Sequence, residues 1–264
     1  MDKQVEKSSL ASPLIQISEE EGSSFGRERS SSVNVSRKNE FYEEMKKQLW
    51  LAGPLITVNI LLYCLQVISL MFVGHHGKLA LSGASMATSF ASVSGFSLLY
   101  GMASALDTLC GQSYGAKKYH LLGIHMQGAM FVLVLVSIPL AIIWANTGAV
   151  LLALGQDADI SEAAGIYTPC MIPALFAYGI VHCLFRFLQT QNIVFPLVLC
   201  SGITTLLHFV VCWILVFKSG LGYRGAAFAN SISYWINLLL IGIIYETLPF
   251  LHKNLDRLFK GGVA

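Results

Sequence analysis

The sequence is poor in charged residues, and acidic residues are missing from two long stretches. Charged residues make up 12% of the 264 positions, whereas soluble domains carry about 25%. No Asp or Glu occurs between Glu44 and Asp107, and none occurs between Glu162 and Glu246. Because an ionised carboxylate is costly in hydrocarbon, this pattern favours a membrane protein over a soluble domain.

Several kinds of site are also missing from the sequence. There is no glycine-rich phosphate loop, no pair of neighbouring carboxylates and no His/Cys cluster with metal-ligand spacing, so neither an enzyme nor a bound cofactor is expected. The net charge of +2 offers no basic face for nucleic acid. Free, buried thiols are expected, rather than disulfides or a zinc site, for the six cysteines Cys64, Cys110, Cys170, Cys183, Cys200 and Cys212.

Long apolar segments make up most of the remaining chain. A helix needs about 20 apolar residues to cross a bilayer, and six segments reach that length. We therefore expect an all-α polytopic membrane protein with six transmembrane helices, within a domain of residues 44–247. The expected spans are residues 49–73, 79–106, 121–144, 164–188, 193–217 and 226–245.

The two flanking segments are polar. Residues 1–43 mix serines with Glu and Arg, and they contain too little apolar surface to offset chain entropy, so a disordered cytosolic tail is expected. Residues 248–264 form a basic tail. If the N-terminus is cytosolic, the inner segments carry ten Lys and Arg residues within about 15 positions of a span, and the outer loops carry only Lys78, Lys218 and Arg224. This asymmetry predicts that both termini are cytosolic.

Polar side chains inside the spans are candidates for a substrate path. Asn59 and Gln66 are seven residues apart and so share a helix face. Small residues fill the second span, which predicts close helix packing. Uncharged hydroxyls and amides suit varied organic ligands, although each can equally bond a neighbouring helix. The candidates for the substrate path are Asn59, Gln66, Ser89, His208 and Asn230.

One enzyme class has a partial pattern in this sequence. Rhomboid-like intramembrane proteases combine six spans with a serine and a histidine in the membrane, and Ser85 and His208 supply these residue types. Met86, however, stands where the nucleophile motif requires a second glycine. This leaves the protease as a distant alternative.

Four motifs carry a specific resemblance. They are Leu81-Ser-Gly-Ala-Ser-Met-Ala-Thr-Ser-Phe-Ala-Ser-Val-Ser-Gly95, Asp107-Thr-Leu-Cys-Gly-Gln-Ser-Tyr-Gly-Ala116, Arg186-Phe-Leu-Gln-Thr-Gln-Asn192 and Gly225-Ala-Ala-Phe-Ala-Asn-Ser-Ile-Ser-Tyr234. In this order, across residues 44–246, the chain resembles plant-type MATE (multidrug and toxic compound extrusion) transporters.

The resemblance implies a function and a partial chain. MATE transporters are antiporters of twelve helices in two six-helix lobes, and they export xenobiotics, secondary metabolites and other small organic substrates in exchange for protons or sodium. This sequence resembles the first lobe, so a truncated isoform or partial chain is expected, active with a second lobe or as a homodimer. The alternative is a transport-inactive half-transporter that partners a full-length one. The membrane is expected to be vacuolar or plasma membrane.

The resemblance also marks residues with an expected structural role. Lysines and glycines around Asp107 suggest a chain leaving the bilayer, with Asp107 at a helix end. Gly111 and Gln112 are expected to fix the exit of the second helix and its contact with the corner at 186–192. The complete set of motif residues is Pro54, Asp107, Gly111, Gln112, Gln189, Gln191 and Asn192.

Overall fold

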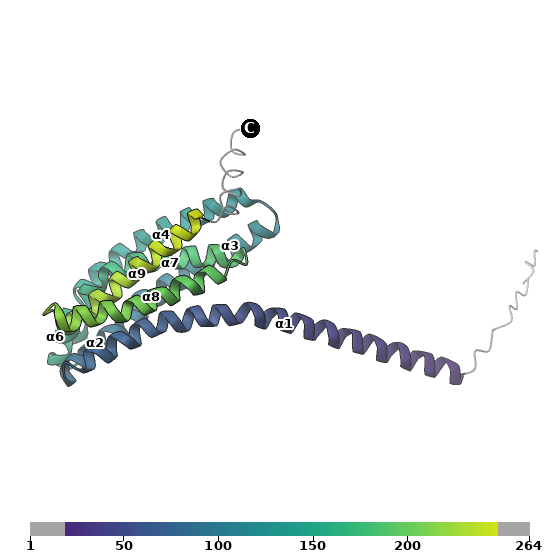
Figure 1. Ribbon diagram of the computed structural model, residues 1–264, viewed down its shortest axis with the longest axis horizontal. Coiled ribbons are helices and arrows are strands. Elements are labelled where there is room, and N and C mark those ends of the chain that lie inside the picture. Colours follow the sequence, from purple (N-terminus) through teal and green to yellow (C-terminus); the bar gives the residue numbers. More distant parts are fainter. Residues whose placement is uncertain (1–18, 248–264) are drawn as a thin grey trace, which may run out of the picture. The chain divides into compact units, whose positions relative to one another are not determined.

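The structure is a computed structural model that describes residues 19–247. All regular elements in this range are helices (Figure 1). In chain order they are α1 (Glu19–Gly74), α2 (Lys78–Ala91), the π-helix η1 (Ser92–Phe96), α3 (Ser97–Gly115), α4 (Tyr119–Ala145), α5 (Thr147–Ala153), α6 (Ala158–Tyr167), the 3-10 helix η2 (Thr168–Met171), α7 (Ile172–Thr190), α8 (Phe195–Trp213), the π-helix η3 (Ile214–Lys218) and α9 (Tyr223–Thr247).

The chain divides into two compact units, Met1–Trp50 and Leu51–Ala264. For residues 19–43 the structure differs from the disordered tail expected for residues 1–43, because helix α1 already begins at Glu19. Residues 1–18 and the expected basic tail of residues 248–264 lie outside the described residues. Nucleation is the costly step of helix formation, and these residues extend a helix that continues into the first span. An exposed ion pair of 2.9 Å between Lys47 Nζ and Glu44 Oε1 bridges neighbouring turns of this helix.

Six helical segments are long and apolar enough to cross a membrane, which confirms the predicted fold class. They are Glu40–Gly74, Lys78–Gly115, Tyr119–Ala145, Ala158–Thr190, Phe195–Lys218 and Tyr223–Glu246. Each one overlaps one of the six predicted spans. The largest differences lie in the first segment, which begins at Glu40 instead of Leu49, and in the second, which continues to Gly115 instead of ending at Leu106.

Irregular turns within three of these segments preserve a continuous helical path. In the second segment, the π-helix η1 widens the backbone, and the Ser94 hydroxyl donates to the Phe90 carbonyl at 2.6 Å. In the fourth, the 3-10 helix η2 contains Pro169. Backbone groups that such turns release are satisfied by nearby hydroxyls or by shifted helical bonds. Prolines and small polar residues therefore bend these segments without ending them.

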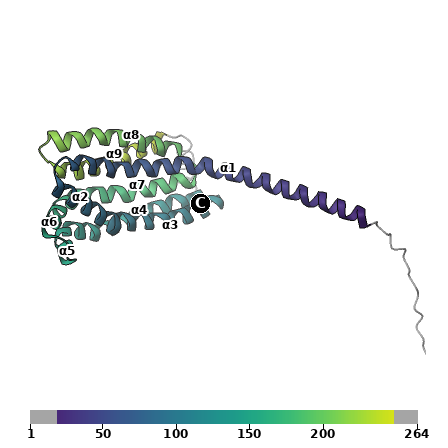
Figure 2. The same ribbon diagram turned by 90° about the horizontal axis from the view of Figure 1, so that it is seen from below.

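Helix α7 forms the centre of the second unit. The apolar window of its segment is 67% buried, against 22–44% for the other five. Helices α3, α4 and α9 all contact α7 (Figures 1 and 2). Rings from three elements meet beside it, since Tyr178 of α7 lies 4.5 Å from Phe96 and 5.5 Å from Tyr234, measured between ring centroids. Side chains on α7 are therefore the ones most enclosed by protein.

Small residues allow close approach at two crossings, as the composition of the second span predicts. A Cβ added at Gly83 of α2 would collide with Ala163 of α6. At Gly95 of η1 it would collide with the ring of Trp144 on α4. The Trp144 indole Nε1–H also donates to the Ser94 hydroxyl at 3.1 Å. Glycine at these positions is thus required for the helices to touch.

The connections are more ordered than the sequence suggests. Residues 146–162, expected as a loop, include α5 and the start of α6. The Asp157 carboxylate caps α6 by accepting from the backbone N–H groups of Asp159 and Ile160 at 3.0 and 3.2 Å. After α3 the chain reverses at Lys117, which has a φ of 57°. The corner after α7 turns at Asn192, with a φ of 61°.

Candidate functional site

An ion pair joins α3 to α7 inside the second unit. Arg186 Nη1 lies 3.0 Å from Asp107 Oδ2, and the side chains are 14% and 42% exposed, respectively. Asp107 therefore does not stand at a helix end, as the sequence suggests. Helix α3 continues to Gly115, and the carboxylate reaches sideways to the neighbouring helix. The pair sums to zero charge, which lowers the cost of holding both groups at a partly buried position.

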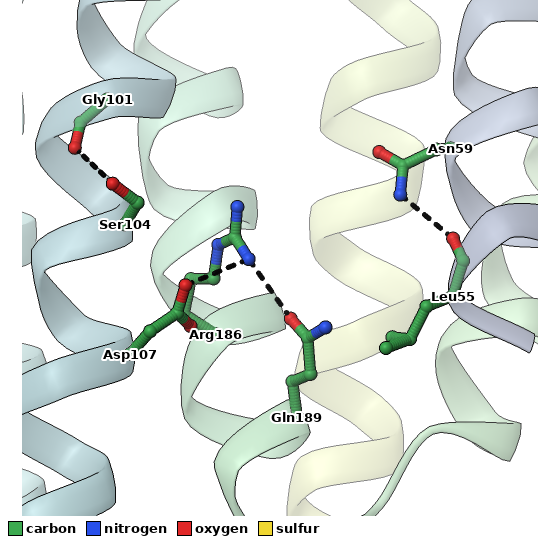
Figure 3. Close-up of polar contacts among 7 residues, drawn as sticks. All are labelled: Leu55, Asn59, Gly101, Ser104, Asp107, Arg186 and Gln189. Carbon is green, nitrogen blue, oxygen red and sulfur yellow. Dashed lines mark hydrogen bonds and ion pairs between the residues drawn. The ribbon is translucent and has the colours of Figure 1, made fainter. Parts of the chain in front are cut away.

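Two further contacts fix the orientation of the Arg186 guanidinium. Nη1 also donates to Gln189 Oε1 at 3.4 Å, so Asp107 and Gln189 share one nitrogen (Figure 3). The guanidinium carbon lies 4.8 Å from the centroid of the Tyr100 ring, a distance typical of a cation–π contact. Arg186 is thereby held from three sides, while its other terminal nitrogen points away from Asp107 and Gln189 in Figure 3.

A small cleft of about 30 Å³ lies beside this ion pair. About 10–15 Å³ of such space holds one water molecule, so the cleft has room for about two to three oxygen-sized groups. Helices α1, α3, α7 and α8 supply its walls. The lining residues are Leu55, Val58, Asn59, Tyr100, His182, Phe185, Arg186, Gln189 and Leu197.

His182 is the most enclosed polar group in the cleft wall. The residue is 4% exposed, and its Nε2 has no hydrogen-bond partner among the described residues. Its ring packs against Tyr178, Tyr100 and Phe185, with centroid distances of 4.2, 5.2 and 5.7 Å. Buried polar atoms are nearly always paired, so the unpaired Nε2 is an exception in this wall.

Of the five residues expected on a substrate path, only Asn59 lines this cleft. Its side chain is exposed, and its Nδ2 donates to the Leu55 carbonyl at 2.8 Å within α1 (Figure 3). The amide donor is therefore partly used by its own helix. The amide oxygen is the atom that can accept from a ligand.

His208 lies elsewhere, at the junction of α1, α8 and α9. It is fully buried, with Nε2 3.1 Å from the Ser69 hydroxyl and Nδ1 2.8 Å from the Ser233 hydroxyl. These bonds tie three helices together and leave the ring no open side. The serine of the protease alternative, Ser85, is not among the partners of His208 within the described residues.

The other three expected path residues are dispersed. Gln66 is half-buried on α1, and Ser89 is exposed on α2. Asn230 on α9 is 1% exposed, and its Oδ1 lacks a partner within the described chain. None of the three is part of the cleft wall. The sequence placed these residues in the membrane but could not show which of them share a site.

The motif residues divide between packing and exposure. Gly111 and Gln112 are exposed on α3, and a Cβ added at Gly111 would meet no atom within 4 Å. The expectation that they contact the corner at 186–192 stays a prediction, whereas Asp107, one turn earlier, does contact that corner through Arg186. Gln191 is buried, and its Nε2 donates to the Phe187 carbonyl at 3.1 Å. Pro54 lies inside α1, which continues past it.

Sequence reasoning did not select Arg186, Tyr100 and His182 as site residues. A signal for the ion pair was nevertheless present. Arg186 is the only Lys or Arg between Lys118 and Lys218, and Asp107 is the only charged residue between Lys78 and Lys117. Two isolated charges of opposite sign in apolar segments are expected to pair with each other. Among the described residues, no three His, Cys, Asp or Glu side chains are placed to hold a metal.

Comparison with known proteins gives consistent matches. Residues 54–214 match the MatE family model. Protein DETOXIFICATION 16 of Arabidopsis thaliana is 65% identical over 207 residues, which are 78% of this chain and 43% of that protein. The crystal structure of the eukaryotic MATE transporter AtDTX14 is 43% identical with a TM-score of 0.78, and the match covers 83% of this chain and 51% of that one. The chain thus spans about half the length of these relatives.

Proposed function

The chain belongs to the MatE family, and from that membership we propose that it forms one six-helix lobe of a secondary transporter. The transporter exports small organic molecules, xenobiotics or secondary metabolites, in exchange for protons or sodium. The observation that carries this proposal is the match to AtDTX14, in which a similar fold occupies about half of a MATE transporter.

The geometry of the second unit supports a role in transport. A substrate path through a membrane needs polar groups that are enclosed by protein and open on one side. The cleft beside Arg186 has this character, since it combines a guanidinium, an imidazole nitrogen and an amide with apolar walls. The ion pair with Asp107 keeps the local net charge at zero.

We further propose that both termini face the cytosol of a vacuolar or plasma membrane. The loops support this orientation. Lys117 and Lys118 follow α3, and Arg186 lies near the end of α7, so these charges gather at one end of the bundle. At the other end, the α1–α2 turn meets the α8–α9 connection, where the rings of His76 and Phe217 lie 6.0 Å apart. The sequence count of Lys and Arg residues near the spans, ten against three, makes the first of these ends the cytosolic one.

The test joins this chain to the second half of Protein DETOXIFICATION 16 and reconstitutes the product in proteoliposomes. An imposed proton gradient should drive uptake of ethidium or a flavonoid by the joined protein, and that second half alone should give none. The intact relative is the positive control. No transport by a folded joined protein, under conditions in which the intact relative transports, would contradict the proposal.

The same preparation tests the transport-inactive alternative, which the coverage of 43% of the relative brings into consideration. For this purpose the chain is reconstituted together with the intact relative. A lowered rate per molecule of relative would identify an inhibitory partner. An unchanged rate would count against that role.

A further inference from the structure

We propose that the cleft beside Arg186 binds the carboxylate group of an organic anion, with Arg186 and His182 as its donors. The inference rests on the proposed function only in treating this anion as a substrate. Binding itself requires only the second unit. The argument depends on the unused donors in the cleft, on its size and on its apolar rim.

Arg186 has donors to spare. A guanidinium carries five N–H groups in a rigid fork, and the contacts with Asp107 and Gln189 both use Nη1. Among the described residues, no acceptor is found for Nη2 or Nε. In Figure 3 the free terminal nitrogen points away from both partners. The planar guanidinium can form two parallel hydrogen bonds with one carboxylate, and no other side chain offers this geometry.

His182 supplies a second donor of the correct kind. A neutral imidazole donates from one nitrogen, and Nε2 is buried without a partner. The neighbouring rings of Tyr100, Tyr178 and Phe185 hold the imidazole in place. Because Nε2 has almost no accessible surface, a ligand oxygen would pair with it only after the imidazole turned toward the cleft. The wall thus presents the guanidinium directly and the imidazole behind it.

The size of the cleft suits a small oxyanion group. Its 30 Å³ accommodates about two to three oxygen-sized groups, which is enough for the two oxygens of a carboxylate. The side chains of Leu55, Val58 and Leu197 complete the wall. They suit an apolar remainder that extends from the carboxylate.

Asp107 does not close the site to an anion. Its carboxylate occupies one nitrogen of the fork and is itself 42% exposed, so water screens it. Its charge also weakens the attraction between Arg186 and a ligand. A transporter must release what it binds, and this partial neutralisation suits reversible occupation.

The experiment is equilibrium dialysis of the purified full chain against radiolabelled benzoate. Benzamide and benzylammonium, which keep the ring but change the charged group, are the comparison ligands. We expect benzoate to bind best. Arg186→Lys, which keeps the charge but loses the fork, should weaken benzoate binding by about tenfold or more. His182→Phe, which keeps a ring but loses the donor, should weaken it by about tenfold.

Arg224→Lys is the matched control. Arg224 is exposed at the start of α9, outside the cleft wall, so this variant should bind benzoate like the unmodified chain. Thermal unfolding without ligand checks that each variant is folded. If Arg186→Lys does not fold, His182→Phe still decides the question.

Three results would overturn the proposal. They are the absence of benzoate binding, unchanged affinity in the folded cleft variants, and stronger binding of benzylammonium than of benzoate. Inorganic phosphate and phosphatidylglycerol micelles serve as competitors. If either displaces benzoate at lower concentration than unlabelled benzoate does, the cleft is a phosphate site and the carboxylate assignment fails.

Dialysis uses neither a second lobe nor a gradient, so the two proposals can fail separately. Transport by the joined protein without benzoate binding would overturn only the carboxylate site. Benzoate binding that depends on Arg186, together with absent transport, would overturn only the transport function.

Discussion

Asp107 and Arg186, which are far apart in the sequence, meet at 3.0 Å between α3 and α7. Asp107 is the only charged residue of α3, and Arg186 is the only charged residue of α7. Each therefore supplies the opposite charge that makes the other tolerable away from bulk water. The pair also fixes the angular position of two helices at the end of the bundle that holds the cleft.

Removal of one partner should cost more than removal of both. Asp107→Asn leaves the guanidinium of Arg186 without its counter-charge, so the free energy of unfolding should fall by about 1–3 kcal/mol. The double variant Asp107→Asn/Arg186→Gln should lose less than Asp107→Asn alone, because no uncompensated charge remains. Denaturant titration in mixed micelles gives all four free energies of a double-mutant cycle. A coupling energy near zero would show that the two groups do not interact in the folded protein.

His208 should contribute to stability and not to substrate choice. His208→Ala removes bonds to Ser69 and Ser233 and leaves a cavity between three helices, so unfolding should become easier by about 2–4 kcal/mol. Ser89→Ala, at an exposed position on α2, should change stability by less than about 0.5 kcal/mol.

The measurement combines thermal unfolding with transport per folded molecule in the joined protein. If His208→Ala keeps its stability but loses transport of one substrate and not of another, His208 belongs to the substrate path after all.

Two glycines on the same membrane segment should respond in opposite ways to alanine. Gly95→Ala places a methyl group against Trp144 and should destabilise the protein by about 1–3 kcal/mol. At Gly101 a Cβ meets nothing within 4 Å, and Gly101→Ala should be neutral or should stabilise by about 0.5–1 kcal/mol through helix propensity. Thermal unfolding of the two variants side by side tests this contrast. Equal losses of stability at both positions would show that an added methyl group destabilises this segment whatever its neighbours.

The six-span topology predicts the sides of three reporters. A reporter fused after Ala264 should match one on the N-terminal tail, and a reporter between Gln156 and Ser161 should lie on the opposite side. Protease protection in sealed vesicles distinguishes the two compartments. If the Gln156 reporter and the Ala264 reporter share a side, the proposed orientation is incorrect.

Hydropathy was sufficient to predict the membrane helices. Backbone groups in hydrocarbon must be bonded within their own segment, so each long apolar run can only be a helix. Hydropathy did not predict where helices end, because it reports the surroundings of a residue and not its backbone. Asp107 and Gln112 are polar yet lie inside α3. Similarly, the polar segment after Trp144 contains two helical elements.

The candidate site was predicted only in part, because it depends on contacts between distant segments. Asn59 was selected from its position in the first span, and the structure places it in the cleft wall. Helical periodicity assigns residues to a face of one helix and cannot say which helix lies opposite. His182 illustrates this, since an isolated histidine in an apolar span gives no sign of an unpaired nitrogen. The missing information is the packing of α7 against α1 and α3.

The ion pair between α3 and α7 also constrains how the chain is made. Arg186 follows Asp107 by 79 residues, and a ribosome adds about 5–20 residues per second. Asp107 thus emerges roughly 4–16 s before its partner exists. Throughout that interval the carboxylate can remain charged only by staying close to water and lipid headgroups. The ion pair can form only after α7 has been synthesised, so α3 reaches its final position at that stage.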